Sequence, residues 1–142
     1  MKVYADPSFI VSLYYLDVHS AEAERRFRQS SPTVVLTSLA ELEVVNALQL
    51  RVFRKEASAS QIRTAKGQFA NDIRAGVFAT AAVPAEAYEL AQNISTKRSA
   101  TLGTRTVDIL HVACASLHGV EGFWTFDARQ AELAKAEGLR VR

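Results

Sequence analysis

The chain has 142 residues, of which 49% are hydrophobic and 23% are charged, and its formal net charge is +2. Its single cysteine excludes an internal disulfide framework, and it has neither a Cys–His zinc pattern nor the roughly 20-residue apolar run of a membrane span. We therefore expect one soluble, cytoplasmic domain over residues 1–142, with a core of its own and no secretory leader.

Short β-rich runs alternate with longer stretches of helical periodicity. In chain order, the β-rich runs cover residues 2–5, 33–36, 77–83, 122–126 and, more weakly, 139–141. The helical stretches cover residues 8–16, 21–28, 39–53, 60–75, 85–97, 107–117 and 128–137, and the least structured piece is 96–104. Strands that alternate with helices predict βαβ units, and apolar strands indicate a sheet covered on both faces. The pattern predicts an α/β fold, a three-layer α/β/α domain with a central parallel sheet.

Three of the five aspartates fall where strands end or helices begin. Asp6 closes the first strand, Asp127 closes the run 122–126, and Asp108 lies in the first turn of an apolar helix. In parallel α/β sheets, ligands bind outside the carboxyl ends of the strands. Each aspartate also has an ordinary explanation, because Asp6 and Asp127 suit helix N-caps and Asp108 has Arg105 three residues before it as an ion-pair partner.

A glutamate of the third helix is the fourth acidic candidate. Ser38 and Glu41 have the S-x-x-E spacing of a capping box, which gives Glu41 a structural role. Glu43 lies about 200° further around the helix and is flanked by apolar residues. Asn46 shares its face and is placed to orient it. We therefore predict that Glu43, rather than Glu41, belongs to the site.

Converging carboxylates need a cation. Like charges at close range raise one another's pKa values, and proteins commonly resolve this with a hard divalent ion such as Mg²⁺ or Mn²⁺. Such sites typically hydrolyse phosphodiesters, because the metal activates a water molecule and stabilises the transition state. The predicted catalytic metal ligands are Asp6, Glu43, Asp108 and Asp127.

A basic run lies between residues 51 and 74. It contains six cationic side chains, opposed only by Glu56 and Asp72: Arg51, Arg54, Lys55, Arg63, Lys66 and Arg74. The run is either a surface that binds nucleic acid or an ordinary solvated helix face. For nucleic-acid binding we single out Arg51, Arg54 and Lys55, together with Arg105.

Other polar residues have simpler explanations. We expect His111 to be a hydrogen-bonded core histidine and Cys114 a small core residue, with His19 and His118 at the surface or in loops. The sequence has no P-loop, and no glycine follows the first strand, so mononucleotide- and dinucleotide-binding motifs are excluded.

Five segments together resemble PIN-domain ribonucleases, and most of all the VapC-type toxins of bacterial and archaeal toxin–antitoxin pairs. They are VYADPS (3–8), EVVNAL (43–48), RTVDILHVACA (105–115), FWTFD (123–127) and AKAEGL (134–139). The resemblance spans essentially the whole chain. It implies a parallel sheet of about five strands and, often, a homodimer.

The resemblance also implies an activity. Asp6, Glu43, Asp108 and Asp127 would bind one or two Mg²⁺ or Mn²⁺ ions for RNA cleavage, and Ser8 and Thr125 would help to hold metal or water. The implied partner is a small VapB-like antitoxin whose C-terminal segment blocks the groove. The residues 128–130 are Ala-Arg-Gln where some family members place a further acid, so a second metal is less supported than the first. A non-toxin RNA-processing nuclease and a metal-free PIN-like binding module are the alternatives.

Overall fold

The structure is a computed structural model and describes residues 1–142. Its middle layer is a parallel sheet of four strands in the order β3-β2-β1-β4. The strands are β1 (Lys2–Ala5), β2 (Thr33–Thr37), β3 (Phe78–Ala81) and β4 (Gly122–Trp124). Tyr4 in β1 lies opposite Val35 on one side and Phe123 on the other. The parallel sheet is confirmed, but the count of about five strands is wrong. Residues 139–141 form no strand, since Val141 makes only an isolated bridge to Phe123.

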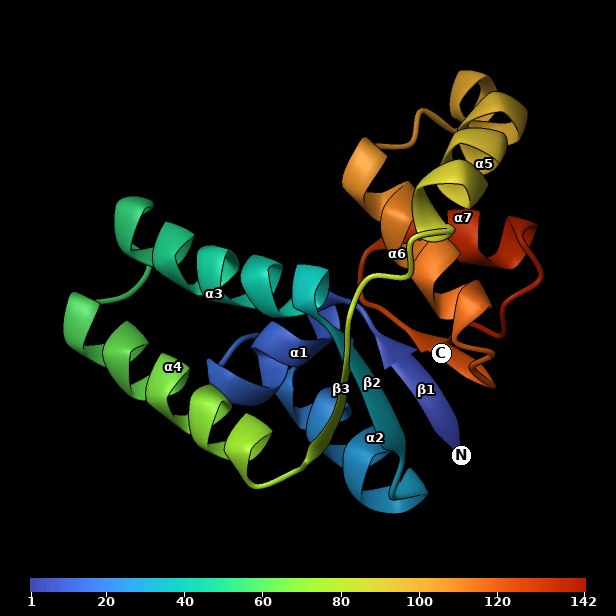
Figure 1. Ribbon diagram of the computed structural model, residues 1–142. Helices are drawn as coiled ribbons and strands as arrows, with labels where there is room; N and C mark the ends of the chain where they lie inside the picture. Colours follow the sequence, from blue (N-terminus) through green and yellow to red (C-terminus); the bar gives the residue numbers. More distant parts are fainter.

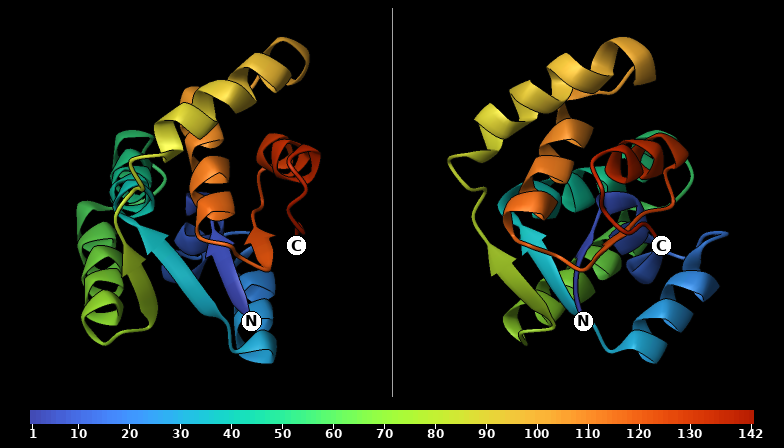
Figure 2. Two further views of the ribbon diagram at one scale, coloured as in Figure 1. Left: turned by 45° about the vertical axis from the view of Figure 1, so that its right-hand side comes forward. Right: turned by 90° about the vertical axis from the view of Figure 1, so that its right-hand side faces the viewer.

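Seven helices cover the two faces of the sheet (Figure 1, Figure 2). One outer layer contains α1 (Pro7–Tyr14), α2 (Ser20–Ser30), α3 (Ser38–Phe53) and α4 (Ala59–Arg74). The other contains α5 (Ala87–Leu102), α6 (Thr106–Leu117) and α7 (Ala128–Ala136). The predicted three-layer α/β/α architecture is therefore confirmed. No helix combines the length and the apolar character that crossing a membrane requires.

Alternate residues of β1 point into two separate hydrophobic cores. Val3 and Ala5 belong to the core under α1, α3 and α4, whereas Tyr4 belongs to the core under α5 and α6. None of the three is more than 1% exposed. The strand is apolar throughout because both of its faces are covered, as the sequence pattern indicated.

Helix α5 extends further than the sequence predicted. It runs from Ala87 to Leu102 and so includes most of residues 96–104, which we expected to be the least structured. Ile94 and Leu102 both pack in the core that α5 shares with α6, so the apolar face of the helix continues past position 97. Gly103 ends the helix with a φ of +63°, a left-handed conformation that glycine adopts without strain.

Strands β3 and β4 are shorter than the runs 77–83 and 122–126. The chain leaves β4 after Trp124, and the next two residues turn toward the start of α1. The Thr125 hydroxyl reaches Asp6, and the Phe126 ring stacks on Phe9. This early exit from the sheet places the segment before Asp127 beside Asp6.

The N-cap of α3 is Thr37, not Ser38. The Thr37 Oγ1 atom accepts a hydrogen bond from the Ala40 amide at 3.2 Å, and Ser38 is the first helical residue. The predicted Ser38–Glu41 capping box is therefore wrong. The cap is the last residue of β2 because the strand's extended backbone has the conformation that an N-cap requires.

Replacing Thr37 with alanine is expected to lower the free energy of unfolding by about 1–2 kcal/mol, because it removes both this cap and a hydroxyl bonded to the Tyr4 OH group at 2.9 Å. Ser38→Ala is the matched control and should change that free energy by less than about 0.5 kcal/mol. Urea unfolding followed by circular dichroism measures both. Equal losses would mean that Ser38 shares the capping role.

Candidate active site

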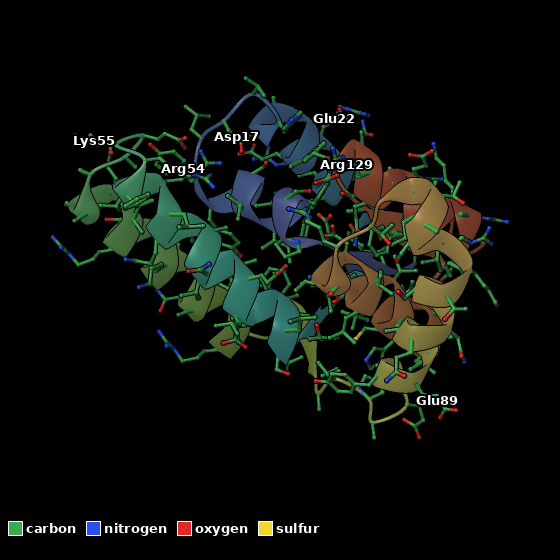
Figure 3. The ribbon with its side chains drawn as sticks, turned by 90° about the horizontal axis from the view of Figure 1, so that it is seen from above. Asp17, Glu22, Arg54, Lys55, Glu89 and Arg129 are labelled. Carbon is green, nitrogen blue, oxygen red and sulfur yellow. The ribbon has the colours of Figure 1, made fainter.

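The candidate acidic residues lie at the edge where the strands of the sheet end. Asp6 follows β1 directly, and Asp127 follows β4 after two residues. Asp108 lies in the first turn of α6, and Glu43 lies near the start of α3. Figure 3 views the molecule from this edge, with α3 on one side and α6 and α7 on the other.

Asp6 is buried and accepts hydrogen bonds from α1 and from the segment that follows β4. It is 4% exposed, and its Oδ1 atom accepts hydrogen bonds from the Phe9 amide at 3.2 Å and the Ser8 hydroxyl at 2.6 Å. Its Oδ2 atom accepts from the Thr125 hydroxyl at 2.5 Å. Burial raises the pKa of the Asp6 carboxyl above its ordinary value, and these three hydrogen bonds offset part of that rise.

Ser8 and Thr125 also fix the backbone on the other side of the site. The Phe126 amide donates to the Ser8 hydroxyl, and the Asp127 amide donates to the Thr125 hydroxyl, both at 3.0 Å. Asp127 in turn is the N-cap of α7, with Oδ1 accepting from the amides of residues 129 and 130. The two hydroxyls therefore couple Asp6 to the segment that carries Asp127.

Arg105 supplies the positive charge at this edge. Its guanidinium forms a two-point contact with Asp108, with Nε 2.8 Å from Oδ2 and Nη2 3.4 Å from Oδ1. The same Nη2 atom lies 3.6 Å from Oδ2 of Asp127. The expected Arg105–Asp108 pair is thus present, and it includes Asp127 as well. These contacts, the one to Asp108 first, raise the pKa of Arg105.

Gln130 supports the same segment of α6. It is buried, and its side-chain amide donates to the backbone carbonyl of Asp108 at 3.2 Å. At position 130, within the segment 128–130 discussed above, this chain therefore has a glutamine that links α7 to α6 by a hydrogen bond.

Glu43 is oriented by a buried chain of hydrogen bonds. Its Oε2 atom lies 2.7 Å from Nε2 of His111, a residue only 1% exposed. The Nδ1 atom of His111 lies 2.7 Å from the Tyr4 OH group, which in turn bonds the Thr37 hydroxyl at 2.9 Å. With Thr37 donating to Tyr4 and Tyr4 donating to Nδ1, the Nε2–H group is left to donate to Glu43. Burial raises the pKa of Tyr4, so its hydroxyl keeps the proton that it donates.

His111 confirms the expectation of a hydrogen-bonded core histidine, but its contact with Glu43 was not predicted. Asn46, the predicted orienting residue, is exposed and borders the same groove, yet it makes no hydrogen bond to Glu43. The one sequence signal for His111 was its place three residues after Asp108 on an apolar helix. Glu41 faces elsewhere, beside Thr80 and Ala81 at the end of β3.

Two neighbouring grooves are bordered by three of the four candidate carboxylates, and the buried Asp6 borders neither. One, of about 660 Å³, is bordered by Glu43, Asn46, Arg105 and Asp108. The other, of about 450 Å³, is bordered by polar residues that include Ser8, Asp17, His19, Arg54 and Asp127. Three residues border both grooves and show that they adjoin: Pro7, Ala47 and Leu50.

The donor chemistry of this edge fits a hard divalent cation, because its candidate ligands are carboxylates with hydroxyl oxygens beside them. The buried Asp6 carboxylate would gain most from such an ion, since a nearby cation stabilises its charged form. The side chains themselves do not close around one point, and no three acidic, histidine or cysteine side chains are grouped to hold a metal. Arg105 pairs with Asp108 and Asp127 instead, and His111 pairs with Glu43.

The basic run does not form one surface. Arg51 is held between Asp17 and Glu56, at 3.4 and 3.6 Å, and its guanidinium lies over the Tyr15 ring. Arg54 is exposed and borders the second groove, near Asp17 in Figure 3. Lys55 is exposed at the end of α3 (Figure 3). The remaining three cations of the run, Arg63, Lys66 and Arg74, lie on the neighbouring helix α4, which packs against α3.

Replacing Asp6 with asparagine is expected to raise the free energy of unfolding at pH 7 in metal-free buffer. A raised pKa means that the folded state binds the proton more tightly than the unfolded state, whose aspartate titrates near pH ~4. Stability is therefore lost as the pH rises through the folded pKa, and the asparagine avoids that loss. Denaturant unfolding at several pH values measures this, and the gain should vanish toward pH ~4.

Asp127→Asn is the matched control, because Asp127 is also an N-cap but its side chain is 35% exposed. It should give no gain at pH 7, since it loses the contact with Arg105. A loss of stability in Asp6→Asn at pH 7 would contradict the assignment of a burial cost to Asp6.

Comparison with known proteins agrees with the fold. A family model described as the PIN domain matches residues 3–136. The structure is similar to that of VapC20 from Mycobacterium tuberculosis, described as a sarcin–ricin loop cleaving toxin, with a TM-score of 0.73, 21% identity and coverage of 96% of this chain and 95% of that chain. It is also similar to PAE2754 from Pyrobaculum aerophilum, with a TM-score of 0.65, 15% identity and coverage of 99% and 83%.

No curated protein matches the sequence. The two structural similarities show a shared fold, and the family match spans nearly the whole chain. The protein belongs to the PIN-domain family.

Proposed function

We propose that this protein is a metal-dependent endoribonuclease and the toxin of a toxin–antitoxin pair. The observation that carries the proposal is the position of Asp6, Glu43, Asp108 and Asp127 along the edge where the strands of a PIN fold end. The similarity to VapC20 supports the assignment as a toxin.

The proposed metal is Mg²⁺ or Mn²⁺, as one or two ions, with these four carboxylates as ligands. Such an ion, when bound, lowers the pKa of a water molecule and stabilises the charge on the scissile phosphate. The chain prepares its own ligands for this task. Ser8 and Thr125 fix both oxygens of Asp6, and His111 fixes one oxygen of Glu43.

Arg105 has a different role in the proposed site. Its side chain is 68% exposed, so its ion pairs with Asp108 and Asp127 are weak and are readily exchanged. We assign it to the neutralisation of these carboxylates in the metal-free protein and to contact with an RNA phosphate when they bind metal. Arg54, at the adjoining groove, and the exposed Lys55 are the further candidates for contacts with the RNA backbone.

The proposed partners are an RNA substrate, a second copy of the chain and a small VapB-like antitoxin that covers the groove. A catalytically silent binding module is the second candidate, favoured by the fact that the acidic side chains do not close around one point. Metal binding separates the two candidates. A nuclease should show a thermal shift with Mn²⁺ that Asp6→Asn removes.

Asp6→Asn and Asp108→Asn are each expected to abolish the cleavage of total cellular RNA with Mg²⁺ or Mn²⁺ while the fold is retained. Glu43→Gln should be equally inactive, and Glu41→Gln is its matched control two positions away on the same helix. Because Glu41 faces another part of the surface, its replacement should leave activity unchanged. Gel analysis of RNA fragments, with EDTA as the blank, measures all four variants.

Full activity in Asp6→Asn or Asp108→Asn would overturn the proposed site. Active Glu43→Gln beside inactive Glu41→Gln would reverse the choice between the two glutamates. Expression in a bacterial host separates a toxin from an RNA-processing nuclease. A toxin should arrest growth, and the arrest should depend on the same carboxylates.

Arg54→Ala is expected to weaken the binding of single-stranded RNA and to reduce the slope of log affinity against log salt by about 0.7, because one phosphate contact is lost. Arg51→Ala should act mainly on stability, since its guanidinium is enclosed by Asp17, Glu56 and Tyr15. Arg63→Ala, on α4, is the control. Fluorescence anisotropy at several salt concentrations measures the slopes, and an unchanged slope in Arg54→Ala would remove Arg54 from the interface.

A further inference from the structure

A stack of aromatic rings runs from the core to the surface beside the acidic residues. The buried Phe9 ring stacks on Phe126, with centroids 5.2 Å apart and planes at 17°. The Phe126 ring stacks in turn on the imidazole of His19, with centroids 4.3 Å apart and planes at 8°. His19 is exposed, so the last ring of the stack lies at the surface.

The loop that carries His19 is held in place despite its exposure. The Asp17 carboxylate accepts hydrogen bonds from the His19 amide and the Ser12 hydroxyl, both at 2.8 Å. Arg51 contacts the same carboxylate, and the Asp17 amide donates to the Ser20 hydroxyl at 2.9 Å. The backbone at His19 is therefore held in place, and the stack on Phe126 orients the imidazole, before any ligand arrives. Such preorganisation reduces the entropy lost on binding.

The surroundings of His19 suit a nucleotide. The ring borders the groove of about 450 Å³ that also includes Ser8 and Asp127 from the proposed catalytic edge. Arg54, with no acidic partner, borders the same groove. The backbone amide of His19 is bonded to Asp17, whereas its ring nitrogens make no hydrogen bond within the protein. An aromatic face, free polar atoms on its edge and a cation for phosphate thus lie in one place.

We propose that His19 is the platform on which one base of a single-stranded RNA substrate stacks, next to the scissile phosphate. This inference rests on the proposed ribonuclease function and adds a base-binding subsite to it. The physical reason is that every base presents a π face, and single-stranded RNA is commonly recognised by stacking on aromatic side chains, histidine included. The base would extend the Phe9–Phe126–His19 stack by one ring.

Nuclear magnetic resonance of the imidazole protons tests the stacking directly. The chain has only three histidines, so their ring signals are few, and the His19 signal is identified by its loss in His19→Phe. A short single-stranded RNA is titrated into wild-type protein in EDTA, and into Asp6→Asn with the diamagnetic ion Mg²⁺, so that the RNA stays uncut. The ring current of a stacked base should move the His19 signal and leave in place the signal of His118, which lies at the far end of α6 from Asp108.

The affinity for the same RNA, measured by fluorescence anisotropy, gives a second readout. His19→Ala is expected to weaken binding about tenfold, the effect of losing one base–aromatic stack. His19→Phe keeps an aromatic face and should retain most of the affinity. Val18→Ala is the matched control, because this neighbour on the same loop is 92% exposed and does not border the groove. Thermal unfolding of each variant excludes a loss of fold as the cause.

The outcomes separate this inference from the proposed function. If the RNA binds or is cleaved while the His19 signal stays fixed and His19→Ala binds normally, the subsite is wrong and the nuclease stands. If the wild-type protein neither binds nor cleaves RNA, both proposals fail. A His19 signal that moves only with the antitoxin, and not with RNA, would assign the stack to a protein partner and overturn the subsite.

Discussion

The burial of the Asp6 carboxylate is the constraint on which the organisation of the site depends. A charged group this far from water is tolerated only with hydrogen bonds to both oxygens. Those bonds come from the first turn of α1 and from Thr125, beyond β4. The pairing of β1 with β4, which sets Ala5 opposite Trp124, brings these two segments together, and the Asp6 amide donates to the Trp124 carbonyl at 3.0 Å. The sheet register thus determines which side chains surround Asp6.

The other three carboxylates interact with two side chains, one exposed and one buried. Arg105 neutralises Asp108 and Asp127 from an exposed position, where an ion pair contributes little to stability. His111 bonds Glu43 from inside the core, where the loss of a hydrogen-bond partner costs about 1–3 kcal/mol. A divalent ion would therefore displace Arg105 far more easily than it would displace His111. Glu43 is therefore held in position by His111, whereas Asp108 and Asp127 can exchange Arg105 for another partner.

Much of the fold could be predicted because hydrophobic periodicity and local signals determine it. The central strands, the order of the helices and the places of Asp6 and Asp127 all follow from residues adjacent in the sequence. Two predictions were wrong because neighbouring residues gave conflicting signals. Ser38 was predicted to cap α3, but the adjacent Thr37 is the N-cap. The polar residues after position 97 indicated a loop, although the apolar face of α5 continues to Leu102.

The contacts that sequence patterns could not show join distant parts of the chain. His111 meets Glu43 across 68 positions and Tyr4 across 107. Only the packing of α6 across the sheet from α3 determines that these three side chains meet. The stack of Phe9, Phe126 and His19 has the same origin, because it depends on the chain leaving β4 early.

The capping and site roles of the aspartates are not alternatives, because each carboxylate has two oxygens. In Asp6 and in Asp127, Oδ1 accepts the amide bonds that start a helix, while Oδ2 faces Thr125 or Arg105. A helix N-terminus also favours a negative charge, so the cap lowers the cost of keeping a carboxylate there. An asparagine can preserve the cap and remove the charge. The fold therefore needs the shape of these side chains, and only the proposed chemistry needs their charge.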